Sequence, residues 1–211
     1  VALMSPVYYP FANAIRDTSR TLVDVPLVKD ENGYYTMDLE NFEATVQKKD
    51  VKLFILCSPH NPVGRVWREE ELRNLLDVCR RNGVYVIADE IHHDLIMPGH
   101  RQITAAAAGD YDSILITLTS ASKTFNLASC QNAMAIIPND ALRAKYDAMT
   151  RKIKTQSGSS FGYVAYEAAF RGGKEWLEQA IRLIYGNYRI LVKGLKQKLP
   201  EAVVSPLEGT Y

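Results

Sequence analysis

Residues 113–126 read SILITLTSASKTFN. The first half is an apolar run, and the second half places Lys123 among small hydroxyl residues. A strand that is apolar on both faces is covered on both sides, as in a parallel sheet packed between helices. An ammonium group at the end of such a strand is costly unless it is paired or uncharged. The stretch predicts a buried strand followed by a functional lysine, although a surface lysine would explain Lys123 taken alone.

Apolar runs and amphipathic segments alternate in both directions from this strand. We predict further strands at 21–28, 52–57, 84–88 and 133–137, and helices at 38–48 (with Asp38 as N-cap), 69–82, 140–154 and 163–170. Residues 174–199 are predicted to form one long helix, or two broken near Gly186, and residues 201–205 a strand. The alternation predicts an α/β fold, with a mainly parallel sheet and helices on both faces.

The pattern becomes mainly helical after residue 138, and the division into two parts is predicted further along, where the long helix begins. We assign residues 1–172 to a large domain, and residues 173–211 to a connecting long helix and the start of a small C-terminal domain. The sequence opens with Val1 and stops at EGTY, where a strand or turn is expected to begin. We therefore expect this chain to be a fragment of a longer protein.

Composition and charge restrict the class of partner. The chain has 211 residues and a net charge of +1, with basic residues scattered along it, so neither nucleic acid nor another polyanion is indicated. No apolar run approaches the roughly 18 residues that a membrane helix needs. The three cysteines form no metal or redox motif and fit a reducing, cytoplasmic location.

Polar residues follow three of the predicted strands directly. The strand at 52–57 is followed by SPHNPVG with Asn61, and the strand at 84–88 by DEIHHD with Asp89 and His92. The strand at 113–118 is followed by Ser120, Ser122 and Lys123. Because ligands bind at the carboxyl ends of parallel strands, we expect these side chains to meet at one edge of the sheet.

Each motif also has a plain interpretation. SPHNP alone would suit a turn, and DEIHHD alone would suit a helix start or a solvated loop. His92 and its neighbours lack a recognised metal-ligand spacing, so we predict no metal site. A phosphate-binding P-loop is excluded, because the glycines that it requires before the lysine are absent.

Pyridoxal phosphate would use all of these residues together. Its aldehyde forms a Schiff base with a lysine amine, and its ring nitrogen needs a carboxylate partner. Its phosphate needs hydroxyl and backbone N–H donors, and its phenolic oxygen needs a donor such as Asn or His. The three strand ends offer one such set.

The motifs SPHNPVGRVW, ADEIHHDL and SASKTFNLASCQ, in this order, resemble those of the fold-type I, class I and II aminotransferases. They are most similar to the cystathionine β-lyase-like subgroup, the C–S β-lyases, and the resemblance covers nearly the whole chain. It implies the large domain of a pyridoxal-phosphate-dependent enzyme, truncated here, that acts on amino acids and forms a homodimer at full length.

The resemblance also implies a role for each site residue. Lys123 would be the Schiff-base lysine and the acid/base, and Asp89 would pair with the pyridinium nitrogen. Asn61 and His92 would contact the phenolic oxygen. The list is completed by the ring-stacking Tyr8 and the phosphate-binding Ser120 and Ser122.

This sequence departs from the family's pattern at three positions. Gln131 stands where class I aminotransferases carry a phosphate-binding arginine, as it does in the lyase-like subgroup, and Ser129 and Cys130 replace the subgroup's usual Gly-Leu. We expect a C–S β-lyase that releases pyruvate, ammonia and a thiol. An aminotransferase is the alternative, and a non-catalytic pyridoxal-phosphate-domain protein is the third. The substrate-carboxylate arginine is expected outside this chain, so the fragment alone should turn over poorly.

Overall fold

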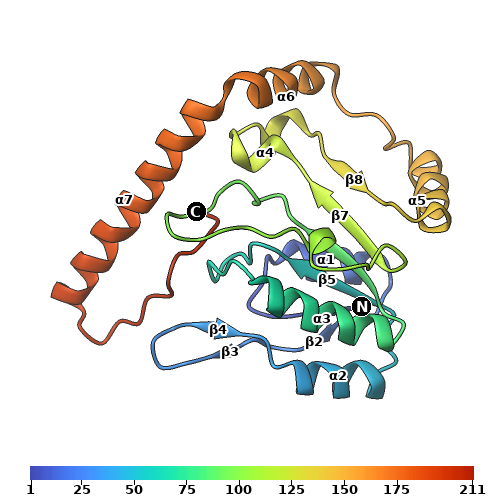
Figure 1. The fold of residues 1–211 in the computed structure, drawn as a ribbon, viewed down its shortest axis with the longest axis horizontal. Coiled ribbons are helices and arrows are strands. Elements are labelled where there is room, and N and C mark those ends of the chain that lie inside the picture. The colour runs from blue at the N-terminus through green and yellow to red at the C-terminus, as the bar shows by residue number, and fades with distance from the viewer.

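Six strands form one twisted sheet in the computed structural model, which describes residues 1–211 (Figure 1). Their order is β2-β1-β5-β6-β7-β8. In chain order they are β1 (Ala2–Leu3), β2 (Val23–Asp24), β5 (Leu53–Cys57), β6 (Tyr85–Asp89), β7 (Leu115–Thr119) and β8 (Met134–Ile136). All neighbours pair in parallel except β7 and β8, which are antiparallel. The prediction of a mainly parallel α/β sheet is confirmed.

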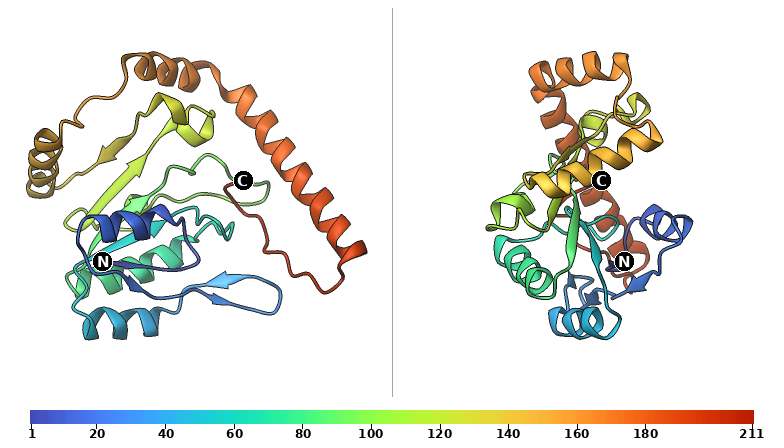
Figure 2. Two further views of the ribbon diagram at one scale, coloured as in Figure 1. Left: turned by 180° about the vertical axis from the view of Figure 1, so that it is seen from behind. Right: turned by 90° about the vertical axis from the view of Figure 1, so that its right-hand side faces the viewer.

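The strand order changes direction between β1 and β5. From β1 the chain moves outward to β2, whereas from β5 it moves the opposite way to β6 and β7. Right-handed crossovers then place the connecting helices on opposite faces, and α1 (Pro10–Asp17) and α3 (Glu69–Arg81) do lie on opposite sides (Figure 2). Such a reversal leaves a crevice at the carboxyl ends of the two diverging strands.

The main hydrophobic core lies between the sheet and the helices α3 and α2 (Leu39–Lys48). Four residues of α3 share one stripe and are completely buried: Leu72, Leu75, Leu76 and Cys79. Burying a large apolar side chain contributes about 1.5–3 kcal/mol. Trp67, also fully buried, donates its indole N–H to the Cys57 carbonyl at 2.9 Å. The core therefore fixes the end of β5, where the polar residues begin.

The ends of these two helices follow the predicted signals. Asp38 caps α2, and its side chain accepts a hydrogen bond from the Asn41 N–H at 3.0 Å. After α3 the chain turns at Gly83, whose φ of +64° favours glycine. Both helices thus begin and end within a residue or two of their predicted limits.

Two predicted strands are corrected. The segment 21–28 does not form one strand, because its first part is β2 and its end belongs to β3 (Val28–Lys29), which pairs with β4 (Tyr35–Thr36) in a separate hairpin. Pro26 has no N–H for a sheet ladder, which explains the break. Residues 201–205 are not a strand and run as irregular chain.

The second half of the chain forms mainly helices that lie outside the sheet, and its end returns toward the sheet. A short 3₁₀ turn η1 (Ala105–Ala107) precedes β7, which is followed by α4 (Ala121–Thr124), η2 (Ala128–Cys130), α5 (Asp140–Ile153), α6 (Ser160–Gly172) and α7 (Lys174–Lys198). The last helix is unbroken at Gly186, since one interior glycine costs only about 1 kcal/mol. Beyond α7 the chain returns to the middle of the molecule (Figure 1). The division at residues 172 and 173 stays a prediction. None of the helices has both the length and the apolar composition that a bilayer crossing requires.

Candidate active site

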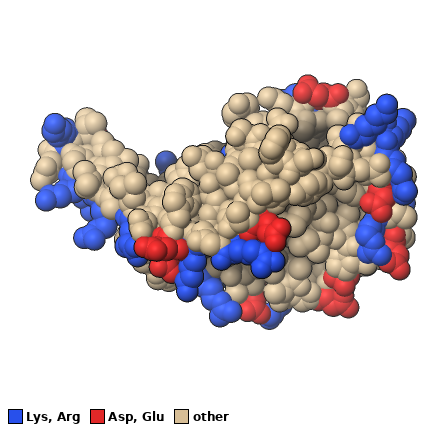
Figure 3. Space-filling view, turned by 90° about the horizontal axis from the view of Figure 1, so that it is seen from above, with Lys and Arg blue, Asp and Glu red and all other residues tan.

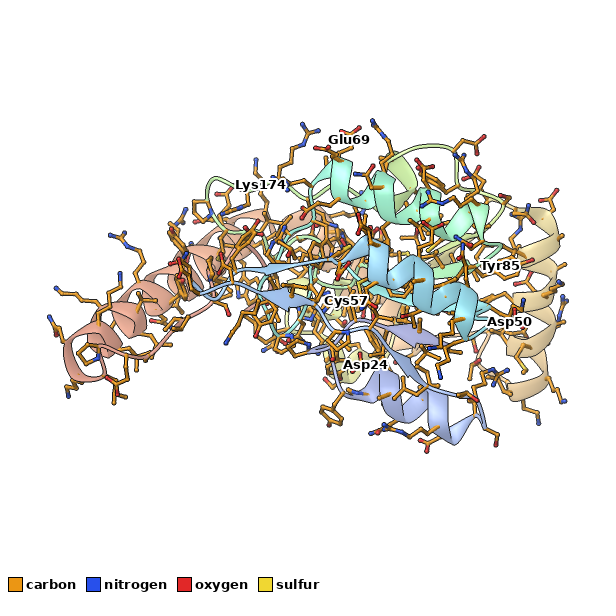
Figure 4. The ribbon with its side chains drawn as sticks, turned by 90° about the horizontal axis from the view of Figure 1, so that it is seen from below. Asp24, Asp50, Cys57, Glu69, Tyr85 and Lys174 are labelled. Atoms are coloured by element: carbon orange, nitrogen blue, oxygen red, sulfur yellow. The ribbon has the colours of Figure 1, made fainter.

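A cavity opens at the carboxyl ends of the strands. Its empty space, including the part open to solvent, amounts to about 410 Å³. Its lining residues are Tyr8, Phe11, Cys57, Asn61, Asp89, Ile91, His92, Lys123 and Tyr211. In Figure 4, Asp50, in the turn before β5, and Tyr85, the first residue of β6, lie on the side away from α7, whereas Cys57 at the end of β5 lies at the centre. The cavity thus occupies the crevice that the reversed strand order creates.

Five of the seven predicted site residues line this cavity. Tyr8 follows β1, Asn61 follows β5, Asp89 ends β6 and His92 follows it, and Lys123 follows β7. The structure therefore brings together residues from four parallel strands, as the shared carboxyl edge predicts.

Lys123 is held from both sides in the single turn α4. Before it, the Ser120 hydroxyl accepts a hydrogen bond from the Ser122 N–H at 3.0 Å. After it, the Thr124 hydroxyl donates to an Asp94 carboxylate oxygen at 2.9 Å. These contacts fix the backbone of the lysine while its side chain enters the cavity.

The two serines lie beside the central cavity and do not line it. Ser120 is buried, and its hydroxyl donates to the Asn132 carbonyl at 2.7 Å and lies 2.8 Å from the Tyr166 hydroxyl on α6. Ser122 lines a neighbouring cavity, together with Lys123 and Tyr211. Ser120 therefore ties α4 to α6, whereas Ser122 faces open space.

Burial dominates the electrostatics of Asp89. Removal from water raises the pKa of this carboxyl group, against the opposing effects of a hydrogen bond from the Ile91 N–H at 3.2 Å and the positive charge of Lys123. An ionised carboxylate is therefore unfavourable here unless a further positive charge comes beside it. The site is prepared for a cationic partner.

His92 is neutral at physiological pH. Burial, followed by the nearby charge of Lys123, lowers the pKa of this imidazole to about 4. Its Nδ1 atom is buried and has no hydrogen-bond partner within the chain. Because buried polar atoms are nearly always paired, this nitrogen requires a partner from outside the chain, either a water molecule or a polar ligand group.

Sequence reasoning missed four lining residues. Cys57 is the last residue of β5 and accepts a long hydrogen bond from the Asn61 N–H at 3.5 Å, and burial raises the pKa of its thiol to about 12. Its position at a predicted strand end could have identified it. Phe11 and Ile91 are close in sequence to predicted residues, but Tyr211 is far from them in sequence, and no pattern indicated it.

The peptide bond between Asn61 and Pro62, in the turn after β5, is cis.

A profile of the family described as "Aminotransferase class I and II" matches residues 1–211. The chain belongs to this family. Among the family's curated members, cystathionine beta-lyase PatB of Bacillus subtilis (strain 168) is 35% identical over 212 residues, covering 100% of this chain and 54% of PatB. Protein MalY of Escherichia coli (strain K12) is 33% identical over 214 residues, with coverage of 100% and 54%. The chain thus spans about half the length of the curated relatives it matches.

Solved structures of the aminotransferase family show the same fold. The PLP-bound C–S lyase from Staphylococcus hominis superposes with a TM-score of 0.92 at 34% identity, over 100% of this chain and 52% of that one. Cystalysin from Treponema denticola, whose crystal structure contains a pyridoxal 5'-phosphate cofactor, superposes with a TM-score of 0.91 at 34% identity, over 100% and 53%. The predicted resemblance to the lyase-like members is confirmed.

Proposed function

We propose that this chain is the cofactor-binding part of a pyridoxal-phosphate-dependent C–S β-lyase. The substrate would be cystathionine or a cysteine conjugate, and the products pyruvate, ammonia and a thiol. The observation that carries the proposal is the convergence of Asn61, Asp89, His92 and Lys123 on one cavity from three neighbouring strands. The similarity to cystathionine β-lyases and C–S lyases supports it.

The residues present fit the cofactor. Asp89 suits a pyridinium nitrogen, because burial makes its charged carboxylate unfavourable unless a positive group lies beside it. The unpartnered Nδ1 of His92 and the amide of Asn61 suit a ring oxygen. Tyr8 borders the cavity and packs edge-on against Phe11, with ring centroids 5.6 Å apart, and would lie against the ring. When bound, pyridoxal phosphate supplies a reactive aldehyde and a ring that accepts electrons.

The proposed chemistry requires three actions from this chain. Nζ of Lys123 would hold the cofactor and would be freed when the substrate's amino group replaces it. The freed Nζ would then take the proton from the substrate's α-carbon, as a positioned base. Asp89 would keep the ring nitrogen protonated, so that the ring can accept electron density. The sulfur would leave the β-carbon with the bonding electron pair and take up a proton as the thiol, and water would release pyruvate and ammonia.

The proposal assigns the phosphate to Ser120 and Ser122, but unequally. The single hydroxyl proton of Ser120 is donated to the Asn132 carbonyl, so Ser120 would have to give up that bond. The Ser122 hydroxyl faces a cavity beside Lys123. Ser122 is therefore the better hydroxyl donor to the phosphate.

Ser122→Ala should weaken cofactor binding about tenfold, because a hydrogen bond to a charged group is worth about 1.5–3 kcal/mol. Ser120→Ala, the matched control, should mainly lower the melting temperature, since its bonds join α4 to α6. Equilibrium dialysis with pyridoxal phosphate and thermal denaturation measure the two effects. An unchanged dissociation constant in Ser122→Ala would remove this serine from the site.

Aminotransfer is the second candidate, supported by the family's name and by matches to kynurenine–oxoglutarate transaminase 3 at 29% identity over 68% of the chain. Both reactions need the same proton removal by Lys123 and differ in where a proton returns. The test uses the full-length protein that contains this chain. We expect pyruvate and sulfide from cysteine, or pyruvate from cystathionine, to form faster than amino transfer from an amino acid to a 2-oxo acid. Faster amino transfer would favour the second candidate.

The proposal also covers partners, domains and location. We propose that the full-length protein is a cytoplasmic homodimer, in which residues 1–172 form the large domain and residues 173–211 lead into a small one. The free cysteines fit a reducing compartment. On the face shown in Figure 3, much of the middle is uncharged, and acidic and basic side chains lie beside one another toward the right-hand end. With a net charge of +1, the chain fits a small-molecule substrate better than a polyanion.

A further inference from the structure

A buried arginine lies at the centre of a charged cluster next to the site. The guanidinium of Arg65, 1% exposed, lies between the rings of Tyr34 and Trp67, at 4.2 and 4.5 Å from their centroids. Its Nη2 donates to both carboxylate oxygens of Glu71 at 2.9 Å, and its Nε donates to Glu208 at 3.0 Å. Every side of this cation is therefore occupied by a specific partner.

Arg65 belongs to the same turn as the site residue Asn61. The His60 N–H donates to the Arg65 carbonyl at 2.8 Å, and the Gly64 N–H donates to the His60 carbonyl at 2.9 Å. The turn is closed by its own backbone, so the arginine and the asparagine move as one unit. A segment that binds Arg65 therefore keeps a fixed position relative to Asn61 and the cavity.

Glu208, the distant partner, lies in the chain that returns after α7 (Figure 1). Its N–H donates to the Gly64 carbonyl at 2.8 Å, and its carbonyl accepts from the Met97 N–H at 2.9 Å. Two residues later the Thr210 N–H donates to the Leu95 carbonyl at 2.9 Å. We call residues 207–211 the return segment. Backbone bonds on both sides fix its path between the Asn61 turn and the loop after His92.

The return segment is tightly packed against its neighbours at Gly209. A Cβ atom on Gly209 would lie 2.7 Å from Val66 Cγ2 and 3.2 Å from the Leu95 carbonyl oxygen. Tyr211, two residues after Gly209, lines the cavity, and its ring centroid is 5.5 Å from that of His92. Tyr211 also lines the neighbouring cavity that Lys123 borders. The ring therefore borders both of the cavities that Lys123 lines.

We propose that the Arg65–Glu208 ion pair is a positioning device, which holds the return segment so that the Tyr211 ring contacts the amino-acid substrate beside Lys123. Arg65 and Glu208 are positioning residues, and Tyr211 is the contacting group. The identity of the ligand rests on the proposed function. The geometry of the segment rests only on the contacts within the chain.

An ion pair suits this task better than an apolar contact. Buried ion pairs contribute little net stability against a well-packed apolar alternative, but their donors and acceptors accept only one arrangement. Glu208 also accepts from the Val66 N–H at 2.9 Å, which ties its carboxylate to the residue that follows Arg65. The pair thus selects one position for the segment.

The test compares Glu208→Gln, Tyr211→Leu, their double variant and the control Glu71→Gln in the full-length, cofactor-loaded protein. Glu71→Gln removes the other carboxylate of Arg65 without touching the return segment. Glycine, which has no β-carbon, is titrated against the visible spectrum of the cofactor. Hydrogen exchange at the Thr210 and Met97 amides reports the segment directly, with or without cofactor.

Glu208→Gln and Tyr211→Leu should each raise the dissociation constant of glycine about tenfold, a change equal to about 1.4 kcal/mol. The double variant should bind no worse than the weaker single variant, because both changes remove one contact. Glu71→Gln should stay within twofold. Exchange at Thr210 should accelerate only where Glu208 is changed.

Unchanged exchange in Glu208→Gln would overturn the positioning role. Accelerated exchange with unchanged glycine binding in both single variants would overturn the contact by Tyr211. If the unaltered protein bound pyridoxal phosphate without a visible band, the proposed function would fail separately, and the exchange data would still decide the positioning role.

Discussion

Lys123→Ala should abolish the visible absorbance of covalently held pyridoxal phosphate and lower turnover by about 10³-fold or more. The side chain has two functions in the proposed chemistry, since Nζ forms the covalent bond and then moves the substrate proton. Proton transfer by a positioned group alone is worth about 10²–10⁴-fold. Loss of the covalent attachment adds to this, because the cofactor is then held by non-covalent contacts only.

Absorbance spectra and pyruvate release from cysteine in the full-length protein measure this result. Lys145→Ala is the matched control, because Lys145 is an exposed lysine on α5, a helix that contributes nothing to the cavity. The control should keep both the band and the rate. A visible band that survives in Lys123→Ala would show that another amine holds the cofactor.

The role of Lys123 could be predicted because the pattern that indicates it lies in the residues next to it. An apolar strand ends directly before it, and the ends of parallel strands share one edge, so Asp89 and Asn61 could be placed beside it without knowing the strand order. The order itself, with its reversal between β1 and β5, came from pairings that no local pattern encodes.

Longer-range contacts explain what the sequence did not predict. Ser120 was expected to bind a phosphate, but its hydroxyl is engaged by Asn132 and by Tyr166, 46 residues away on α6. Tyr211 lies at the site at the end of a segment whose Glu208, 143 residues after Arg65, pairs with that arginine. Neither partner follows from periodicity or turn signals, since each depends on where α6 and α7 send the chain.

Asp89→Asn should make the cofactor-free protein more stable at pH 7 while lowering turnover by about 10²–10³-fold. Burial raises the pKa of Asp89 above its ordinary value, so the folded protein holds this proton at pH values where the unfolded chain has lost it. Stability therefore falls as pH rises from the ordinary value of about 3.9 through the raised one, and the penalty is present at pH 7, well above the ordinary value. Asparagine has no such penalty, and removing a functional charge of this kind gains on the order of 1 kcal/mol.

The loss of activity has the opposite cause. The unfavourable carboxylate is the group that would keep the ring nitrogen protonated, and a neutral amide cannot do so. Urea denaturation of the cofactor-free protein at pH 7 and near pH 3 separates the two effects, because the stability gain should vanish at the lower pH, where Asp89 is protonated in both states. Asp112→Asn, which changes an exposed carboxylate, should alter neither turnover nor this pH dependence. In the proposed role, burial of the Asp89 carboxylate is a cost of folding that the positive charge of the bound cofactor offsets. Turnover of Asp89→Asn within threefold of the parent would contradict this role. A lower stability of Asp89→Asn at pH 7 would contradict it as well.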